Sequence, residues 1–134
     1  GSNADMALKI IDELISNFPI DQKRIYIIGY SMGGFGTFEF LAMKPKLFAA
    51  GVTVAGGASP QNAQKLKDIP IWAFHGDADE AVKVESTRNI VEAIKKLNGK
   101  IKYTEIPGGD HGIANQVYQD QEMHKWLFEQ KRAD

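Results

Sequence analysis

The chain has no cysteine among its 134 residues, so it can form neither disulfide bonds nor thiolate metal sites. No apolar run approaches the roughly 20 residues that are needed to cross a bilayer. Neither sign of charge is in marked excess: the chain has 16 Lys and Arg and 17 Asp and Glu, for a net charge of −1. This balance gives no electrostatic reason to bind nucleic acid or an anionic membrane, and we expect neither partner.

The remaining composition is that of one globular domain, with 43% hydrophobic and 25% charged residues. Residues 1–4, Gly-Ser-Asn-Ala, lack the basic and apolar stretches of a secretion signal, and we interpret them as a cloning remnant. The compartment stays open: cytoplasmic, or secreted or periplasmic if an upstream signal was removed.

Helical and extended patterns alternate along the chain. Apolar residues recur every three or four positions in residues 6–18, which predicts an amphipathic helix before Pro19. Further helices are predicted at residues 35–43, 61–67 and 84–97. A final helix is predicted to begin after Asp120, which would cap it. Apolar runs predict strands at residues 25–28, 48–55, 69–74 and 101–106. The alternation predicts an α/β three-layer sandwich with a mainly parallel sheet of about four strands.

A Gly-x-Ser-x-Gly pattern joins the first predicted strand to the next helix, in the run Gly29-Tyr30-Ser31-Met32-Gly33. Such a nucleophile elbow turns so sharply that we expect a Cβ at either glycine to clash. The turn lifts the serine hydroxyl clear of the sheet, and the Met32 N–H at the helix start could stabilise an oxyanion. Ser31 is therefore the candidate nucleophile; the alternative is a glycine-rich turn with an idle serine.

A serine nucleophile needs a base, and the chain offers three histidines. His111 lies in a glycine-rich loop after the last predicted strand, where a side chain can reach across the end of the sheet. His124 falls within the C-terminal helical pattern and is expected on the helix surface. His75 ends a strand and is interpreted as a packed or turn-stabilising residue. His111 is the candidate base.

The carboxylate that orients the base should also follow a strand. Asp77, Asp79 and Glu80 come directly after the third predicted strand. Asp79 is preferred, because a turn at Gly76 can bring a residue three positions later back over the strand ends. Asp77 is expected to bond neighbouring backbone N–H groups in that turn. Asp110 is the weaker candidate, because adjacent residues usually point apart.

The resulting order, Ser31, Asp79, His111, is that of the α/β-hydrolases. The chain resembles the C-terminal half of such an enzyme, in the esterase, prolyl-oligopeptidase-like and dienelactone-hydrolase-like group. The resemblance covers residues 6–131 and rests on three motifs, RIYIIGYSMGG, HGDADEAV and GGDHG. It implies nucleophile, acid and base roles for these three residues, no cofactor, and hydrolysis of a small-molecule carboxylic ester through an acyl-enzyme.

The chain departs from a complete hydrolase before the elbow. The family has about four strands there, and a loop among them supplies a second oxyanion-hole N–H. Here only the helix at residues 6–18 precedes the elbow strand, so we interpret residues 5–134 as the C-terminal portion of an α/β-hydrolase domain. The alternatives are a weak or inactive fragment that serves as an interaction or carrier domain, or a peptidase or thioesterase with the same motifs.

Two further expectations follow. Without upstream strands the elbow strand becomes a free edge, which favours a homodimer or swapped assembly through residues 24–29. The acidic residues also allow a weaker hypothesis, a metal site. It is disfavoured because carboxylates are common in turns and because no His-x₃-His spacing occurs. Its ligands would be Asp77, Asp79, Glu80, Asp110 and His111.

Overall fold

The computed structural model describes residues 2–133, and its strands and helices alternate. The strands are β1 (Tyr26–Tyr30), β2 (Ala50–Val54), β3 (Ile71–Gly76) and β4 (Ile101–Ile106). The helices are α1 (Ser2–Asn17), α2 (Met32–Met43), α3 (Ala63–Leu66), α4 (Glu85–Lys96), α5 (Ala114–Tyr118) and α6 (Gln121–Glu129), with the short 3-10 helix η1 (Pro60–Asn62) before α3. All four predicted strands are present.

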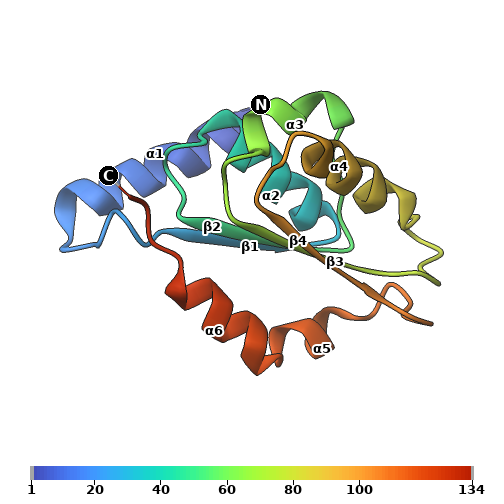
Figure 1. Cartoon of the computed structure of the whole chain (residues 1–134). Helices are drawn as coiled ribbons and strands as arrows, with labels where there is room; N and C mark the ends of the chain where they lie inside the picture. Colours follow the sequence, from blue (N-terminus) through green and yellow to red (C-terminus); the bar gives the residue numbers. More distant parts are fainter. Residues whose placement is uncertain (1, 134) are drawn as a thin grey trace.

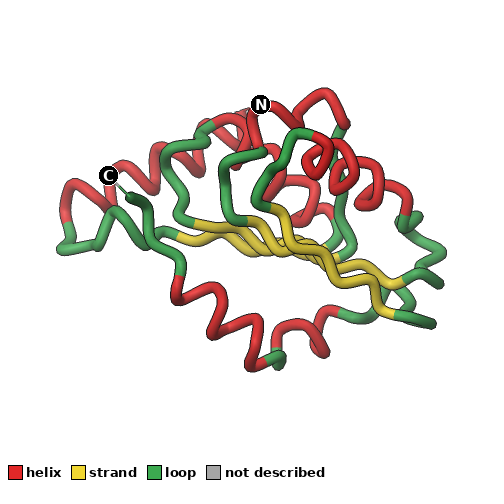
Figure 2. Tube along the Cα trace, in the orientation of Figure 1, coloured by secondary structure: helices red, strands yellow, loops and turns green. Residues whose placement is uncertain are grey.

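The four strands form one sheet in the order β1-β2-β3-β4, and every neighbouring pair is parallel. Helices α1 to α4 cover one face of this sheet, and α5 and α6 cover the other (Figure 1). A trace coloured by secondary structure shows the same three layers (Figure 2). The predicted three-layer α/β sandwich is confirmed. Because the strands are parallel, the loops after them all leave from one edge of the sheet.

Two apolar clusters hold the layers together. On one face, Phe38 and Leu41 of α2 and Ile90 of α4 are fully buried, in one cluster with side chains of β3. On the other face, Met123 and Leu127 of α6 pack under β2 and β3. Every residue of β2 and β3 is buried, which explains why these strands read as near-continuous apolar runs.

The structure differs from the sequence predictions mainly at element ends. Helix α2 begins at Met32 rather than at residue 35. The sequence pattern missed its first turn because Gly33 and Gly34 there are weak helix formers. Strand β3 begins after Pro70 and continues through His75 to Gly76. Helix α5 was not predicted, since its five residues are too short for a periodic signal. The predicted cap of α6 is confirmed.

That cap is Asp120, whose carboxylate accepts hydrogen bonds from the backbone N–H groups of Glu122 (2.9 Å) and Met123 (3.3 Å). It satisfies two of the donors that open a helix. The cap thereby fixes the start of the helix that places Met123 and Leu127 in the core.

Strand β1 lies at an edge of the sheet, and the apolar surface around it is exposed. Within residues 3–17 of α1 only Leu8 is buried, whereas a row of apolar side chains at every fourth position, along the helix and directly after it, is open to solvent. The row comprises Met6, Ile10, Leu14 and Phe18. Ile28 on β1 is also exposed, at 42%. A strand with one unpaired edge beside exposed apolar side chains is a template for association.

We therefore propose that the chain forms a homodimer through residues 24–29, and we expect light scattering after size exclusion to give about twice the 14.8 kDa chain mass. Ile28→Lys should convert the dimer to monomer, because a lysine on an edge strand opposes pairing. Leu97→Lys is the matched control, since Leu97 is similarly exposed (39%) at the end of α4. A wild-type chain that elutes as a stable monomer contradicts the dimer.

One buried polar group has no partner. Thr53 of β2 is fully buried, and its hydroxyl makes no hydrogen bond within residues 2–133. Thr53→Val removes the hydroxyl at nearly constant shape, so we expect the free energy of unfolding in urea to rise by about 1 kcal/mol.

Thr87→Val is the matched control, because the buried Thr87 hydroxyl contacts both Gly56 O and His75 Nδ1 at 2.8 Å. Its loss should lower the same free energy by roughly 1–3 kcal/mol, since buried partners are left unpaired. Equal destabilisation by the two variants would contradict the assignment of Thr53 as unpartnered.

Candidate active site

The turn between β1 and α2 holds Ser31 in a strained backbone conformation, with φ at 57° and ψ at −116°. A positive φ at a non-glycine residue costs on the order of 1–3 kcal/mol and persists only where its surroundings enforce it. Here the Ser31 N–H donates to Val54 O of β2 (2.8 Å), and the N–H groups of Gly34 and Phe35 donate to Ser31 O (2.9 and 3.1 Å). The side chain is thereby presented at the carboxyl edge of the sheet.

The expected clash of a Cβ is confirmed at one of the two elbow glycines, Gly29, and not at the other, Gly33. A Cβ at Gly29 would collide with the backbone carbonyl of Gly33 and with the Thr37 hydroxyl. A Cβ at Gly33 would meet no described atom within 4 Å, so the expectation of a clash there is wrong. The second tight position is Gly34, whose Cβ would lie 3.0 Å from Gly56 Cα. The close approach of α2 to the loop after β2 therefore depends on Gly34.

Alanine substitutions should separate these positions. Gly33→Ala should leave the free energy of unfolding unchanged or raise it by up to about 1 kcal/mol, because alanine is the better helix former. Gly29→Ala should lower the free energy of unfolding, by several-fold more than Gly33→Ala raises it. The reason is that the backbone around Gly33 would have to move to make room for the new Cβ. Urea unfolding of both variants measures the difference, and equal effects would contradict the steric assignment.

The structure brings Ser31, Asp79 and His111 together from three different loops. Ser31 Oγ lies 3.0 Å from His111 Nε2, and His111 Nδ1 lies 2.8 Å from Asp79 Oδ2. Because an ionised carboxylate can only accept, Nδ1 carries the ring proton when the imidazole is neutral. Nε2 then presents its lone pair to the Ser31 hydroxyl. This is the tautomer that a general base for Ser31 requires.

Asp79 is buried, and all its oxygen contacts come from hydrogen-bond donors. The N–H groups of Ala81 and Val82 donate to Oδ1, each at 2.9 Å, while Oδ2 faces His111. Burial by itself raises the pKa of Asp79, but the hydrogen bonds from His111, Val82 and Ala81 outweigh it and leave the pKa below its ordinary value. The carboxylate is therefore ionised near neutral pH and oriented by its own turn.

Tyr30 holds the loop that carries the base. Its hydroxyl donates to the backbone carbonyl of His111 (2.6 Å), and the two rings lie 5.2 Å apart between centroids. The sequence identified Tyr30 only as an elbow residue. The signal available in the sequence was a tyrosine directly before the nucleophile. In the structure its side chain lies on the side of the sheet opposite α2. The Tyr30 hydroxyl thus anchors the loop that contains His111 to β1, the strand that directly precedes Ser31.

The other candidates lie in supporting positions. Asp77 Oδ1 accepts from the N–H of Gly108 (2.7 Å), so it joins two neighbouring loops rather than bonding within its own turn as expected. Asp110 Oδ1 accepts from Gly112 N–H (2.7 Å), as a turn aspartate does. Glu80 is exposed. His124 is only half-buried on α6, where its Nε2 contacts the carbonyl of Tyr118 (2.6 Å).

Met32 opens α2, so its N–H has no partner within the helix and lies directly after Ser31. Its side chain is 88% exposed. Within residues 2–133, no group of three His, Asp or Glu side chains is arranged to hold a metal ion. No helix of the described chain combines the length and apolarity that crossing a membrane requires.

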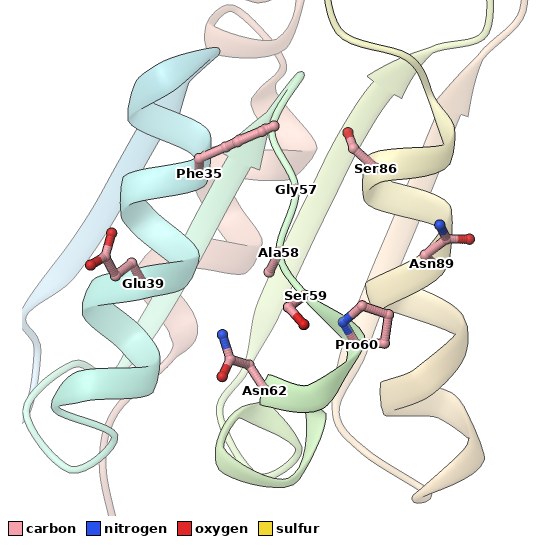
Figure 3. Close-up of a pocket in the computed structure, with 9 residues that line it drawn as sticks. All are labelled: Phe35, Glu39, Gly57, Ala58, Ser59, Pro60, Asn62, Ser86 and Asn89. Atoms are coloured by element: carbon pink, nitrogen blue, oxygen red, sulfur yellow. The ribbon is translucent and has the colours of Figure 1, made fainter.

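Hollows lie at the surface near the loops that follow the strands. A cavity of about 540 Å³ opens between α2, the segment after β2, and α4, with Phe35 reaching across from α2 (Figure 3). Its polar lining includes Glu39, Asn62 and Asn89. A second hollow of about 480 Å³ is lined by His111 and by residues of the loops after β3 and β4. Of the three convergent side chains, His111 lines the second hollow, and Asp79 lines a further one of about 330 Å³.

A parallel sheet with a strained serine turn and an Asp-His pair at its carboxyl edge is the architecture of α/β-hydrolases. The family model for phospholipases and carboxylesterases matches residues 2–126. The chain belongs to this family.

Related proteins extend well beyond the matched region. A thermostable esterase of known structure is 39% identical with a TM-score of 0.96, covering 98% of this chain but 38% of its own. Acyl-protein thioesterase 1 of Neurospora crassa is 33% identical over 76% of this chain and 44% of its own. The protein named "Probable carboxylesterase SOBER1-like" of Arabidopsis thaliana is 25% identical over 92% and 48%. The chain thus spans less than half of each relative.

Proposed function

We propose that this chain is the catalytic-triad portion of a serine hydrolase that cleaves small carboxylic esters through an acyl-enzyme. The observation that carries the proposal is the continuous pair of contacts from Ser31 Oγ to His111 Nε2 (3.0 Å) and from His111 Nδ1 to Asp79 Oδ2 (2.8 Å). Residues 5–134 would be the C-terminal portion of the hydrolase domain.

In the first half of the reaction, Ser31 Oγ attacks the ester carbonyl carbon while His111 Nε2 takes the hydroxyl proton. Asp79 holds the ring tautomer and stabilises the imidazolium that forms. The tetrahedral oxyanion accepts a hydrogen bond from the Met32 N–H. The carbon–oxygen bond to the leaving group then breaks, His111 returns its proton to the alcohol, and the acyl group stays on Ser31.

In the second half, water replaces the alcohol. His111 takes a proton from the water, the hydroxide attacks the acyl carbon, and the proton returns to Ser31 as the carboxylic acid leaves. Since His111 protonates the departing alcohol, the hollow beside His111 is the natural place for that part of the substrate.

The number of N–H donors in the oxyanion hole determines the kcat that we expect. Met32 N–H is one donor, and residues 2–133 offer no evident second donor beside Ser31. Loss of one such donor typically costs about 10²- to 10³-fold in kcat. We therefore expect slow turnover alongside an intact ability of Ser31 to react. Oxygen esters are the first substrate class, since two of the compared relatives carry esterase names, and a thioester is the comparison substrate because the third is a thioesterase.

Labelling with a fluorophosphonate tests the nucleophile without requiring turnover. The wild-type chain should be labelled at pH 8, and Ser31→Ala should lose the label completely. Ser16→Ala, an exposed serine on α1, is the matched control and should label like wild type. Asp79→Asn should slow hydrolysis of p-nitrophenyl acetate by about 10⁴-fold, because the amide favours the wrong histidine tautomer.

Absence of labelling in a folded wild-type chain contradicts the enzyme and supports the carrier or interaction domain instead. Labelling that persists in Ser31→Ala contradicts Ser31 as the nucleophile. Faster cleavage of a thioester than of the matched oxygen ester would reassign the substrate class while leaving the triad in place.

A further inference from the structure

We propose that His75 is a positioning residue, which holds the Asp79 carboxylate and its turn in the geometry that His111 needs. The inference rests on the proposed function above for its kinetic consequence. It goes beyond the triad, because His75 contacts neither Ser31 nor the ring of His111 in any hydrogen bond.

His75 lies directly behind Asp79, and the side chains of both are fully inaccessible to solvent. Its Nε2 is 2.8 Å from the carbonyl oxygen of Val82 and 3.3 Å from Asp79 Oδ2. A carbonyl can only accept, so Nε2 carries a proton that it donates to Val82 O. The same nitrogen lies beside Asp79 Oδ2, the oxygen that receives the hydrogen bond from His111.

The other ring nitrogen is fixed from the opposite side. His75 Nδ1 lies 2.8 Å from Thr87 Oγ1, which in turn lies 2.8 Å from Gly56 O. The Ser86 hydroxyl already donates to that carbonyl at 2.6 Å. Because a carbonyl can only accept, the Thr87 hydroxyl also donates its proton to Gly56 O, and its oxygen holds Nδ1 of His75 from the other side. The contacts therefore run without a break from Gly56 through Thr87 and His75 to the Asp79 turn.

The chain of contacts gives the Asp79 turn a rigid support. Asp79 Oδ1 binds the N–H groups of Ala81 and Val82, and His75 binds the carbonyl of that same Val82. The N–H groups of the turn are thus bound by the Asp79 carboxylate. The Val82 carbonyl of the same turn is bound by the His75 ring, which is packed between β3 and α4. Removing the ring frees Val82 O and one side of Oδ2. A displacement of about 1 Å at such a site can cost on the order of 10²-fold in rate.

Two substitutions separate positioning from simple packing. His75→Leu keeps apolar volume but removes both nitrogens, and kcat for p-nitrophenyl acetate should fall by about 10- to 100-fold with KM changed less than about threefold. His75→Gln retains an N–H donor that can reach Val82 O and should recover at least part of the loss. Thr53→Val is the matched control, since it also removes a fully buried polar atom of the sheet and should keep wild-type kcat.

A second readout does not depend on catalysis. The proton shared by His111 Nδ1 and Asp79 should give a low-field proton NMR signal at low pH in wild type and in Ser31→Ala. His75→Leu should shift or broaden it, and His75→Gln should restore it. Wild-type kcat together with an unchanged signal in His75→Leu overturns the proposal, as does an equal loss of kcat in the leucine and glutamine variants.

The two readouts also distinguish this inference from the proposed function. If wild type gives the signal but no fluorophosphonate label, the hydrolase assignment fails, and the response of the signal to His75→Leu still decides the positioning role. Should His75→Leu not fold, Thr87→Val carries the test, because it leaves His75 in place without its second support. A reduced kcat and a broadened signal in that variant support the proposal; wild-type values for both overturn it.

Discussion

Parallel pairing of the four strands is the constraint on which the site depends. Because every strand runs in the same direction, the loops after β1, β3 and β4 leave from one edge of the sheet. Residues separated by 32 and 80 positions in the chain can therefore meet within hydrogen-bond distance. Two buried central strands make this edge rigid, since any rotation of β2 or β3 would disturb the packing on both faces.

The site itself is supported mainly by hydrogen bonds that do not involve the reacting atoms. Ser31 is held by the carbonyl of Val54, the His111 loop by the hydroxyl of Tyr30, and Asp79 by its own turn. Each contact removes a degree of freedom from one catalytic candidate. The strained φ at Ser31 and the buried carboxylate both cost free energy, and these supporting contacts offset that cost.

The surface around β1 has a different character from the site. Ile28 of β1 and a row of apolar residues along α1 and directly after it are exposed to solvent. The three relatives compared are all more than twice as long as the region they share with this chain.

Local chemistry was sufficient to predict much of this protein from sequence. The strand–helix alternation predicted the sandwich, the glycine-serine pattern located the elbow, and residue types after strands selected Ser31, Asp79 and His111. The sequence could not reveal that Gly33 has free space while Gly34 does not, nor that His75 supports Asp79. Steric space and hydrogen-bond partners are set by residues distant along the chain, so only the packed structure decides them. Periodicity and turn chemistry act over a few neighbouring residues, and these are what the sequence by itself determines.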